Sequence, residues 1–290
     1  GLSAGGLDPA ERERIHQQQQ ARSEMETKRN EQQRQKAARR AVAILRECEP
    51  GPSAYLTAKA LGSMSALINR YVIAVGALTF PTGSLVVPLT DEKGELVNVQ
   101  IIDDRGSKSY LAGGRKAGAF HRIEGGELVA VVEGVATGLS VHLVTGATVY
   151  CAMDAGNLLA VAKIARHLHP NAQILLCGDN DATTEGNPGK TKAEQAAAAV
   201  GALMVLPPEF SGDWNDYLQA HGLDETKQAI MILVNTTESQ SVGTTTSTSQ
   251  PNDATQTEGT ELIPLHPEAK AISQEKEQDL PHGFAIRRAR

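Results

Sequence analysis

The alternation of short apolar runs with helix-forming segments between Glu127 and Val234 limits most strongly what this chain can fold into. The apolar runs fit buried strands: 128–132, 147–152, 173–177 and 202–206. The segments between and after them fit helices: 135–144, 155–168, 190–200, 213–220 and 224–234. This order predicts an α/β unit in which helices cover both faces of a parallel sheet. In such sheets the ligand site lies at the carboxyl ends of the strands.

The rest of the chain divides by composition into three segments. Residues 1–50 form a polar N-terminal segment, because Glu11 to Glu49 lacks Gly and Pro and is dense in charged and Gln residues. We expect a long solvated helix there, which is favoured over a basic arm on nucleic acid because acidic residues are interleaved. Residues 236–290 begin as a Ser/Thr-rich stretch and are expected to be a disordered linker and tail.

Residues 51–126 are expected to form a small basic α+β subdomain ahead of an α/β domain over 127–235. The Pro- and Gly-containing run from Glu49 to Pro52 should end the first helix, and Tyr55–Leu67 fits a short helical hairpin. The β-rich runs 72–75, 85–89 and 96–102 fit a small antiparallel sheet. Basic residues then gather in a Gly-rich stretch: Arg105, Lys108, Arg115, Lys116, His121 and Arg122. This stretch fits a phosphate-tracking surface and an ordinary charged loop about equally.

Composition excludes several classes of protein. The 290 residues carry a net charge of −6, and only 3% are aromatic, which argues against a uniformly basic nucleic-acid coat and against extensive base-stacking platforms. Three widely spaced cysteines form no CxxC pair, which argues against a zinc ribbon and fits a reducing, cytoplasmic location. No apolar run has transmembrane length and no signal peptide is visible, so no membrane partner is expected. The first residue is Gly rather than Met, so we expect a fragment or a processed product.

Carboxylates follow two of the expected strands. The first strand runs into Glu133-Gly134, and the third runs into Gly178, Asp179 and, two residues on, Asp181. Parallel strands end at the same edge of a sheet, so we expect the three carboxylates to converge there. Their mutual repulsion calls for a cation, and hard oxygen ligands select Mg²⁺ or Mn²⁺. The two glycines should leave room for a phosphate to approach.

These residues resemble the Toprim fold, which bacterial-type primases, topoisomerases of types IA and II, recombination-mediator proteins and some nucleases share. The resemblance covers about Pro52 to Val234 and rests on Glu133-Gly134 and on the Asp179-x-Asp181 pair. Other segments are similar to phage and plasmid primases: Tyr55-Leu56 with Lys59, Asp103–Lys108, Gly113-Gly114, Gly118–Phe120, Ala155–Leu158 and Asp213–Asp216.

The resemblance implies a DNA primase catalytic core that makes short RNA primers on single-stranded DNA for a phage or plasmid. It implies nucleoside triphosphates as substrates, Mg²⁺ or Mn²⁺ as cofactor and a replicative helicase, separate or fused, as partner. Glu133 would act as general acid/base or metal ligand, with Asp179, Asp181, Asp213 and Asp216 at the metal. For Asp213, capping of the helix that follows is an equally good explanation. Residues expected to contact nucleic acid or phosphate are Lys108, Arg115, Lys116, Arg122 and Lys190, with Gly134 and Asn157 lining the site.

Two other functions remain open, a metal-dependent Toprim nuclease and a non-catalytic DNA-binding module of a replication or conjugation complex. A topoisomerase is disfavoured because this length holds no tyrosine-bearing cleavage domain. The zinc-binding module that the primase family usually carries is not in this sequence. The stretch Gly186–Thr191 fails the spacing of a P-loop and does not directly follow a strand.

Overall fold

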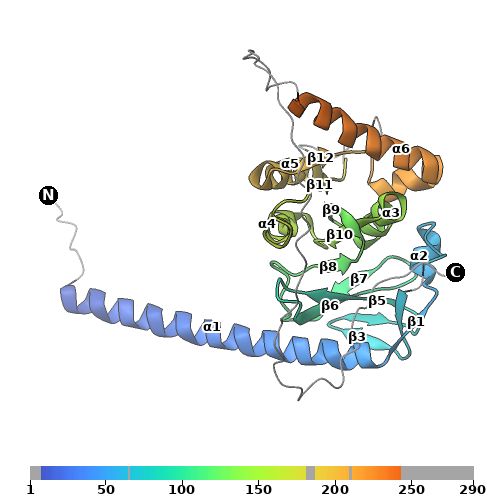
Figure 1. Ribbon diagram of the computed structural model, residues 1–290. Helices are drawn as coiled ribbons and strands as arrows, with labels where there is room; N and C mark the ends of the chain where they lie inside the picture. The colour runs from blue at the N-terminus through green and yellow to red at the C-terminus, as the bar shows by residue number, and fades with distance from the viewer. Residues whose placement is uncertain (1–7, 65, 181–186, 209–210, 243–290) are drawn as a thin grey trace, which may run out of the picture.

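The computed structural model describes residues 8–64, 66–180, 187–208 and 211–242. Two five-stranded sheets and a two-stranded hairpin make up its β structure, and long helices pack around them. Figure 1 shows the first helix, α1 (Pro9–Arg46), reaching far beyond the rest of the chain with its N-terminal part. Its last turns bury Ala37, Ala41 and Ile44 against the first sheet, so only this end has tertiary support.

The N-terminal sheet has the order β1-β2-β5-β6-β7, and all of its pairs are antiparallel. Its strands are β1 (Cys48–Gly51), β2 (Ala66–Asn69), β5 (Leu85–Thr90), β6 (Leu96–Ile102) and β7 (Lys108–Tyr110). A separate hairpin pairs β3 (Ile73–Val75) with β4 (Leu78–Phe80). The expected antiparallel sheet is therefore confirmed for the runs 85–89 and 96–102, whereas the run 72–75 lies in the separate hairpin.

One prediction for the start of this region is incomplete and one is wrong. The run that was expected to end the first helix does follow the end of α1 at Arg46, but it also forms strand β1, in which Pro50 lies opposite Leu67. Because β1 is an edge strand, a proline without an amide hydrogen is tolerated there. The expected helical hairpin over Tyr55–Leu67 is one short helix, α2 (Ala54–Ala58), and its second half joins β2. Pairing with a strand distant in the chain overrides the local helical pattern.

The second sheet is the one expected from the alternating pattern. Its order is β12-β11-β9-β10-β8, and the pairs among β9–β12 are parallel. These strands are β9 (Gly126–Val132), β10 (Ala147–Cys151), β11 (Ile174–Cys177) and β12 (Leu203–Val205). The edge strand β8 (His121–Ile123) pairs antiparallel with β10, so the end of the basic stretch belongs to this sheet rather than to a loop.

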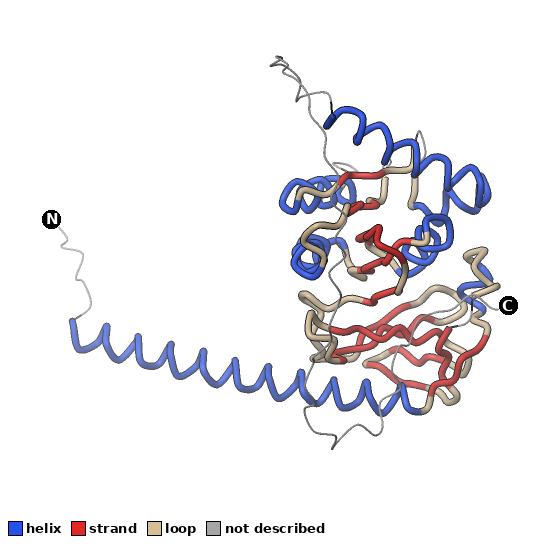
Figure 2. The backbone as a smooth tube through the Cα atoms, in the orientation of Figure 1, coloured by secondary structure: helices blue, strands red, loops and turns tan. Residues whose placement is uncertain are grey.

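Helices cover both faces of the second sheet (Figure 2). On one side lie α3 (Val135–Thr145) and α6 (Trp214–Val242), and on the other lie α4 (Leu158–Leu168) and α5 (Pro188–Val200). The one-turn 3₁₀ helix η1 (Ala155–Asn157) leads into α4. The α6 helix breaks at Gly222, which has φ of 80°, and this matches the two helices expected on either side.

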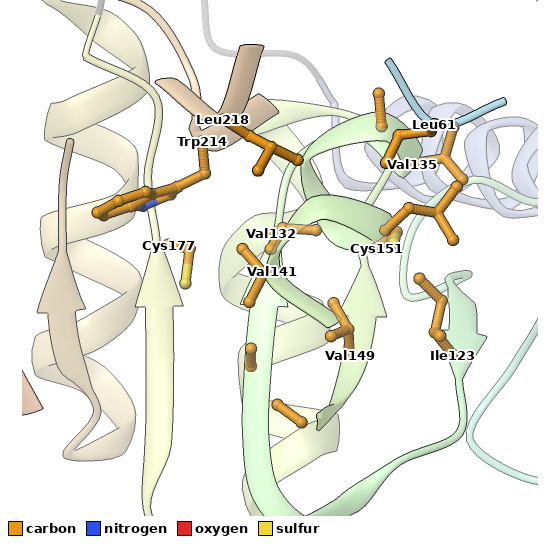
Figure 3. Packing of buried hydrophobic residues seen from close by; sticks show 14 of the residues in the cluster. Leu61, Ile123, Val132, Val135, Val141, Val149, Cys151, Cys177, Trp214 and Leu218 are labelled. Atoms are coloured by element: carbon orange, nitrogen blue, oxygen red, sulfur yellow. The ribbon is translucent and has the colours of Figure 1, made fainter. Parts of the chain in front are cut away.

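The buried cluster on the α3 side continues from the second sheet into the N-terminal sheet. Figure 3 shows Val132, Val149, Cys177 and Trp214 packed together at this face. Trp214 is fully buried, and its indole N–H donates to the carbonyl of Val205 at 3.2 Å, so it is a core residue. Because one buried cluster contains residues of both sheets, the N-terminal sheet and the second sheet pack against each other.

The C-terminal linker prediction is partly outside the described residues. The α6 helix continues to Val242, six residues past the expected start of the linker at 236, so the prediction of disorder is wrong for this part. Residues 243–290 lie outside the described part of the chain. Among the described residues no helix is long and apolar enough to cross a membrane.

Candidate active site at the carboxyl edge of the parallel sheet

The strands that precede Glu133 and Asp179 are direct neighbours. In the register of β9 and β11, Val132 lies opposite Cys177. Glu133 is the next residue after β9, and Asp179 follows β11 after Gly178. The structure thus confirms that these two carboxylates, 46 positions apart in the chain (179 minus 133), leave the sheet side by side at one edge.

A third carboxylate comes to this edge through a backbone bridge. Asn180 and Gly212 form an antiparallel bridge with two hydrogen bonds of 3.0 Å. In that register Asp179 and Asp213 are the next pair across, and residues opposite each other share a face. Thr137, in the first turn of α3 after Glu133-Gly134, donates its hydroxyl to Asp213 at 2.9 Å. These contacts bring Asp213 between the Asp179 loop and the start of α3.

Asp213 also caps α6. Its Oδ1 accepts the backbone N–H groups of Asn215 at 2.7 Å and Asp216 at 2.9 Å. The capping explanation is therefore confirmed. The Asp213 carboxylate can still accept a further hydrogen bond or a metal ion. A carboxylate has about four acceptor positions, and three N–H or O–H donors bond to this one.

Asp216 faces the N-terminal region instead. Its Oδ1 lies 3.5 Å from Nζ of Lys59, one residue past α2, and its Oδ2 accepts the Asp213 backbone N–H at 3.4 Å. Asn215 strengthens the same junction, since its amide donates to the Lys59 carbonyl and to Ser140 Oγ, each at 2.9 Å. Lys59 therefore neutralises part of the acidic edge.

The aspartates at this edge contribute to the raised pKa values of neighbouring side chains. Burial raises the pKa of Tyr55, and the charges of Asp213 and Asp216 raise it further. Burial raises the pKa of Cys177 to about 12, with a contribution from Asp179. Burial likewise raises the pKa of Cys151, so both cysteines are inert buried thiols.

The donor set fits a divalent ion only in part within the described residues. Glu133 and Asp179 supply the hard oxygen ligands that Mg²⁺ and Mn²⁺ prefer. Among the described residues, however, no three His, Cys, Asp or Glu side chains form a group that could hold a metal. Asp181, the third predicted ligand, lies outside the described residues.

The two glycines of the edge differ. A Cβ at Gly134 would meet only Thr137 Oγ1, at 3.8 Å, so this position, the N-cap of α3, is open as expected. A Cβ at Gly178 would lie 2.7 Å from Met204 and 2.9 Å from Ala193. Gly178 is thus needed for close packing of β11, and the space expected there for a phosphate is filled.

The predicted basic residues do not form one patch. Arg115 Nη1 lies 3.2 Å from Asp91 Oδ2, whose side chain is only 8% exposed, and Arg122 Nη2 lies 2.9 Å from Glu124 Oε2. Arg122 also lies over the Tyr150 ring. Burial lowers the pKa of His169, beyond the end of α4, and the charge of Arg122 lowers it further. The remaining three are exposed or partly exposed: Lys108 on β7, Lys116 before β8 and Lys190 at the start of α5. Lys190 pairs with Glu194 at 3.8 Å.

Asn157 holds two segments of the chain together by hydrogen bonds of its side chain and also lines the cavity beside this edge. Its Oδ1 accepts the Gly118 N–H at 2.8 Å, and its Nδ2 donates to the carbonyls of Ala119 and Ala152 at 2.8 and 2.9 Å. It joins the basic stretch to the end of β10.

Sequence reasoning missed three residues that the structure brings to this edge: Lys59, Tyr110 and Thr137. The only signal for Thr137 was its place in the helix that follows Glu133.

The part of the chain that contains the parallel sheet and the acidic edge matches a known family. Residues 128–224 match the family model described as Toprim domain, and this part of the chain is therefore a Toprim domain. Toprim domains generally bind divalent metal ions.

The relatives found in comparisons with known proteins are larger. The chain is 32% identical over 216 residues to a protein named DNA primase TraC of Escherichia coli, which covers 69% of this chain and 19% of that protein. A second Escherichia coli protein of the same name is 31% identical over 166 residues, 54% of this chain and 11% of that protein. The chain thus spans at most about a fifth of the length of these relatives.

Solved primase structures are similar at lower identity. The primase fragment of the bacteriophage T7 primase-helicase protein aligns with a TM-score of 0.44 at 16% identity, covering 64% of this chain and 77% of that chain. The RNA polymerase domain of Mycobacterium tuberculosis primase DnaG aligns with a TM-score of 0.40 at 14% identity, covering 70% of this chain and 76% of that chain.

Proposed function

We propose that this chain is the catalytic core of a DNA primase that joins ribonucleotides on a single-stranded DNA template, with Mg²⁺ or Mn²⁺ as cofactor. The observation that supports the proposal is that the strands before Glu133 and Asp179 are direct neighbours, with Asp213 next to the Asn180–Gly212 bridge and bonded to Thr137. The similarity to two proteins named DNA primase directs the proposal toward primer synthesis rather than another Toprim reaction.

The reaction joins a 3′-hydroxyl to the α-phosphorus of a nucleoside triphosphate and releases pyrophosphate. The hydroxyl proton must leave as the new P–O bond forms, and in this proposal Glu133 accepts it or holds the ion. Glu133 and Asp179 are the residues that would hold the divalent ion, joined in this proposal by Asp181, Asp213 and Asp216. Such an ion, when bound, stabilises negative charge on the phosphate oxygens.

The side chains of the basic stretch have different parts in this proposal. Lys108, Lys116 and Lys190 would contact template or nucleotide phosphates, since their ammonium groups reach solvent. Arg115 and Arg122 are held by carboxylates, so their contribution to phosphate binding should be small. A replicative helicase, separate or fused, remains the partner that a primase of this kind requires.

The test is incubation of the protein with single-stranded DNA, labelled ribonucleoside triphosphates and Mg²⁺ or Mn²⁺. Short labelled oligoribonucleotides are expected, and their loss on chelation of the metal should be complete. Degraded template would replace the proposal with a nuclease. DNA binding with neither product would replace it with a non-catalytic module.

A further inference from the structure

A cavity of about 320 Å³ opens beside the acidic edge, between the N-terminal sheet and the end of β10. Four buried apolar residues line its inner part: Leu89, Ala119, Ala152 and Met153. These four residues come from three segments of the chain. Leu89 lies in β5, Ala119 lies before β8, and Ala152 and Met153 follow β10. Small, flat apolar surfaces of this kind suit a planar group such as a nucleobase.

The rim of the cavity carries three groups of different chemistry. Lys116 Nζ lies 4.3 Å from the centre of the Tyr110 ring, and Asp154 stands across from them in the lining. Among the described residues neither Lys116 nor Asp154 takes part in an ion pair. Asp154 Oδ1 accepts the N–H of Gly156 at 2.7 Å, so the carboxylate is oriented and its other oxygen retains acceptor capacity.

The cavity is built rigidly and is connected to Glu133. Tyr110 donates its hydroxyl to the Met153 carbonyl at 2.7 Å, and the Met153 N–H donates to the Glu133 carbonyl at 2.6 Å. Met153 has φ of 65°, a left-handed conformation that is unfavourable for a residue with a side chain. The surrounding contacts hold this strained turn in place, and strain of this kind is typical of ligand sites.

We propose that this cavity binds the nucleoside part of a ribonucleoside triphosphate, with the base on the apolar inner part, the phosphates toward Lys116 and the ribose hydroxyls on Asp154. A carboxylate at the rim is a natural acceptor for the ribose 2′-hydroxyl, as in other nucleotide sites. Asp154 is then the residue that separates ribonucleotides from deoxyribonucleotides. The proposal deepens the primase function and rests on it only for the identity of the nucleotide.

The experiment measures binding of ATP, 2′-deoxy-ATP and adenosine to the full chain by calorimetry. It is done with the unmodified chain and without a template, so that no primer is made. We expect ATP to bind about tenfold more tightly than 2′-deoxy-ATP, the size of one hydrogen bond to a charged group. Asp154→Ser keeps an acceptor for the Gly156 N–H but removes the carboxylate, so ATP should weaken to the level of 2′-deoxy-ATP. The matched control, Glu92→Gln, removes an exposed carboxylate elsewhere and should change neither ligand.

Two further variants test the other parts of the cavity. Lys116→Met should weaken ATP but leave adenosine unchanged, and Ala160→Phe should fill the cavity and weaken all three ligands. An unchanged ratio of ATP to 2′-deoxy-ATP affinity in Asp154→Ser overturns the proposal. So does an Ala160→Phe variant that loses binding of an oligodeoxynucleotide but keeps ATP, which would make this a template site.

The two proposals fail separately. Primer synthesis by the unmodified chain with no role for Asp154 leaves the primase function intact and removes this site. Ribose-dependent binding without primer synthesis leaves this site intact and removes the primase function.

Discussion

The acidic edge of the Toprim sheet and the basic stretch between residues 105 and 122 are assembled in opposite ways. The acidic residues lie far apart in the chain, yet Glu133, Asp179 and Asp213 meet at one edge. The basic residues are close in the chain, yet Arg115, Lys116 and Arg122 take separate directions. Strand order in a parallel sheet determines where strand ends lie, whereas proximity along a loop determines little about where its side chains point.

The strongest test of this contrast is removal of one carboxylate from the acidic edge. Glu133→Gln keeps the size of the side chain but removes its basicity. Primer synthesis should fall roughly 100- to 10,000-fold with little change in melting temperature, which a priming assay and a thermal melt measure. Glu127→Gln, at the other end of the same strand, should retain activity. Equal losses in both variants would remove any special role of the carboxyl edge.

A second test concerns His121, which the sequence places among the basic residues. Its Nδ1 lies 3.0 Å from the Pro88 carbonyl, and burial lowers its pKa from 6.5 to about 4. The folded chain therefore holds a neutral imidazole that the unfolded chain protonates below pH 6.5. Stability from this group is complete above pH 6.5 and is lost as the pH falls toward 4, by roughly 3 kcal/mol.

The measurement is urea unfolding across this pH range. His121→Asn keeps a donor for the Pro88 carbonyl and does not titrate, so its stability should fall less steeply between pH 6.5 and 4 than that of the unmodified chain. Parallel slopes in the two proteins would show that His121 is charged in the folded state and belongs to the basic surface after all.

A third test separates Arg115 from its neighbour Lys116. Arg115→Met leaves the buried Asp91 carboxylate with only its backbone partners, so the free energy of unfolding should fall by about 1–3 kcal/mol. Lys116→Met removes an exposed charge and should change stability by less than about 0.5 kcal/mol. Chemical denaturation of both variants decides the matter. A stable Arg115→Met variant that loses DNA binding would restore a single basic surface.

The smallest effect should come from separating the two roles of Asp213. Asp213→Ala removes the cap of α6 and should cost about 1 kcal/mol, whereas Asn caps as well as Asp and should cost almost nothing. If Asp213 also serves the metal, Asp213→Asn needs more Mg²⁺ for half-maximal primer synthesis at unchanged melting temperature. An unchanged metal requirement would leave Asp213 a cap only.

The sequence predicts the two halves of the molecule unequally. The strands and helices of the Toprim domain follow from local apolar patterns, and the adjacency of Glu133 and Asp179 follows from parallel topology. The stretch from Glu49 to Leu67 was mispredicted because β1 forms by pairing with β2, and β2 by pairing with both β1 and β5. Local patterns contain no information on such a pairing.

The difference between local patterns and contacts of distant segments also explains which site residues the sequence did not predict. The ion pair of Lys59 with Asp216 joins residues 157 positions apart and has no signature in either segment. The hydrogen bonds that link Tyr110 through Met153 to Glu133 depend on a left-handed backbone conformation at Met153. Methionine rarely adopts this conformation, so the sequence does not predict the turn. Helix capping by Asp213, in contrast, was visible from its place before a helix.

The central claim is that Glu133 and Asp179 share one divalent ion at the carboxyl edge of the sheet. The most direct measurement is titration with Mn²⁺ followed by electron paramagnetic resonance, which counts free ion without any nucleotide present. The account predicts a bound Mn²⁺ in the unmodified chain and at least about tenfold weaker binding in both Glu133→Gln and Asp179→Asn. Binding of equal strength in all three proteins, with Glu127→Gln as control, would contradict it.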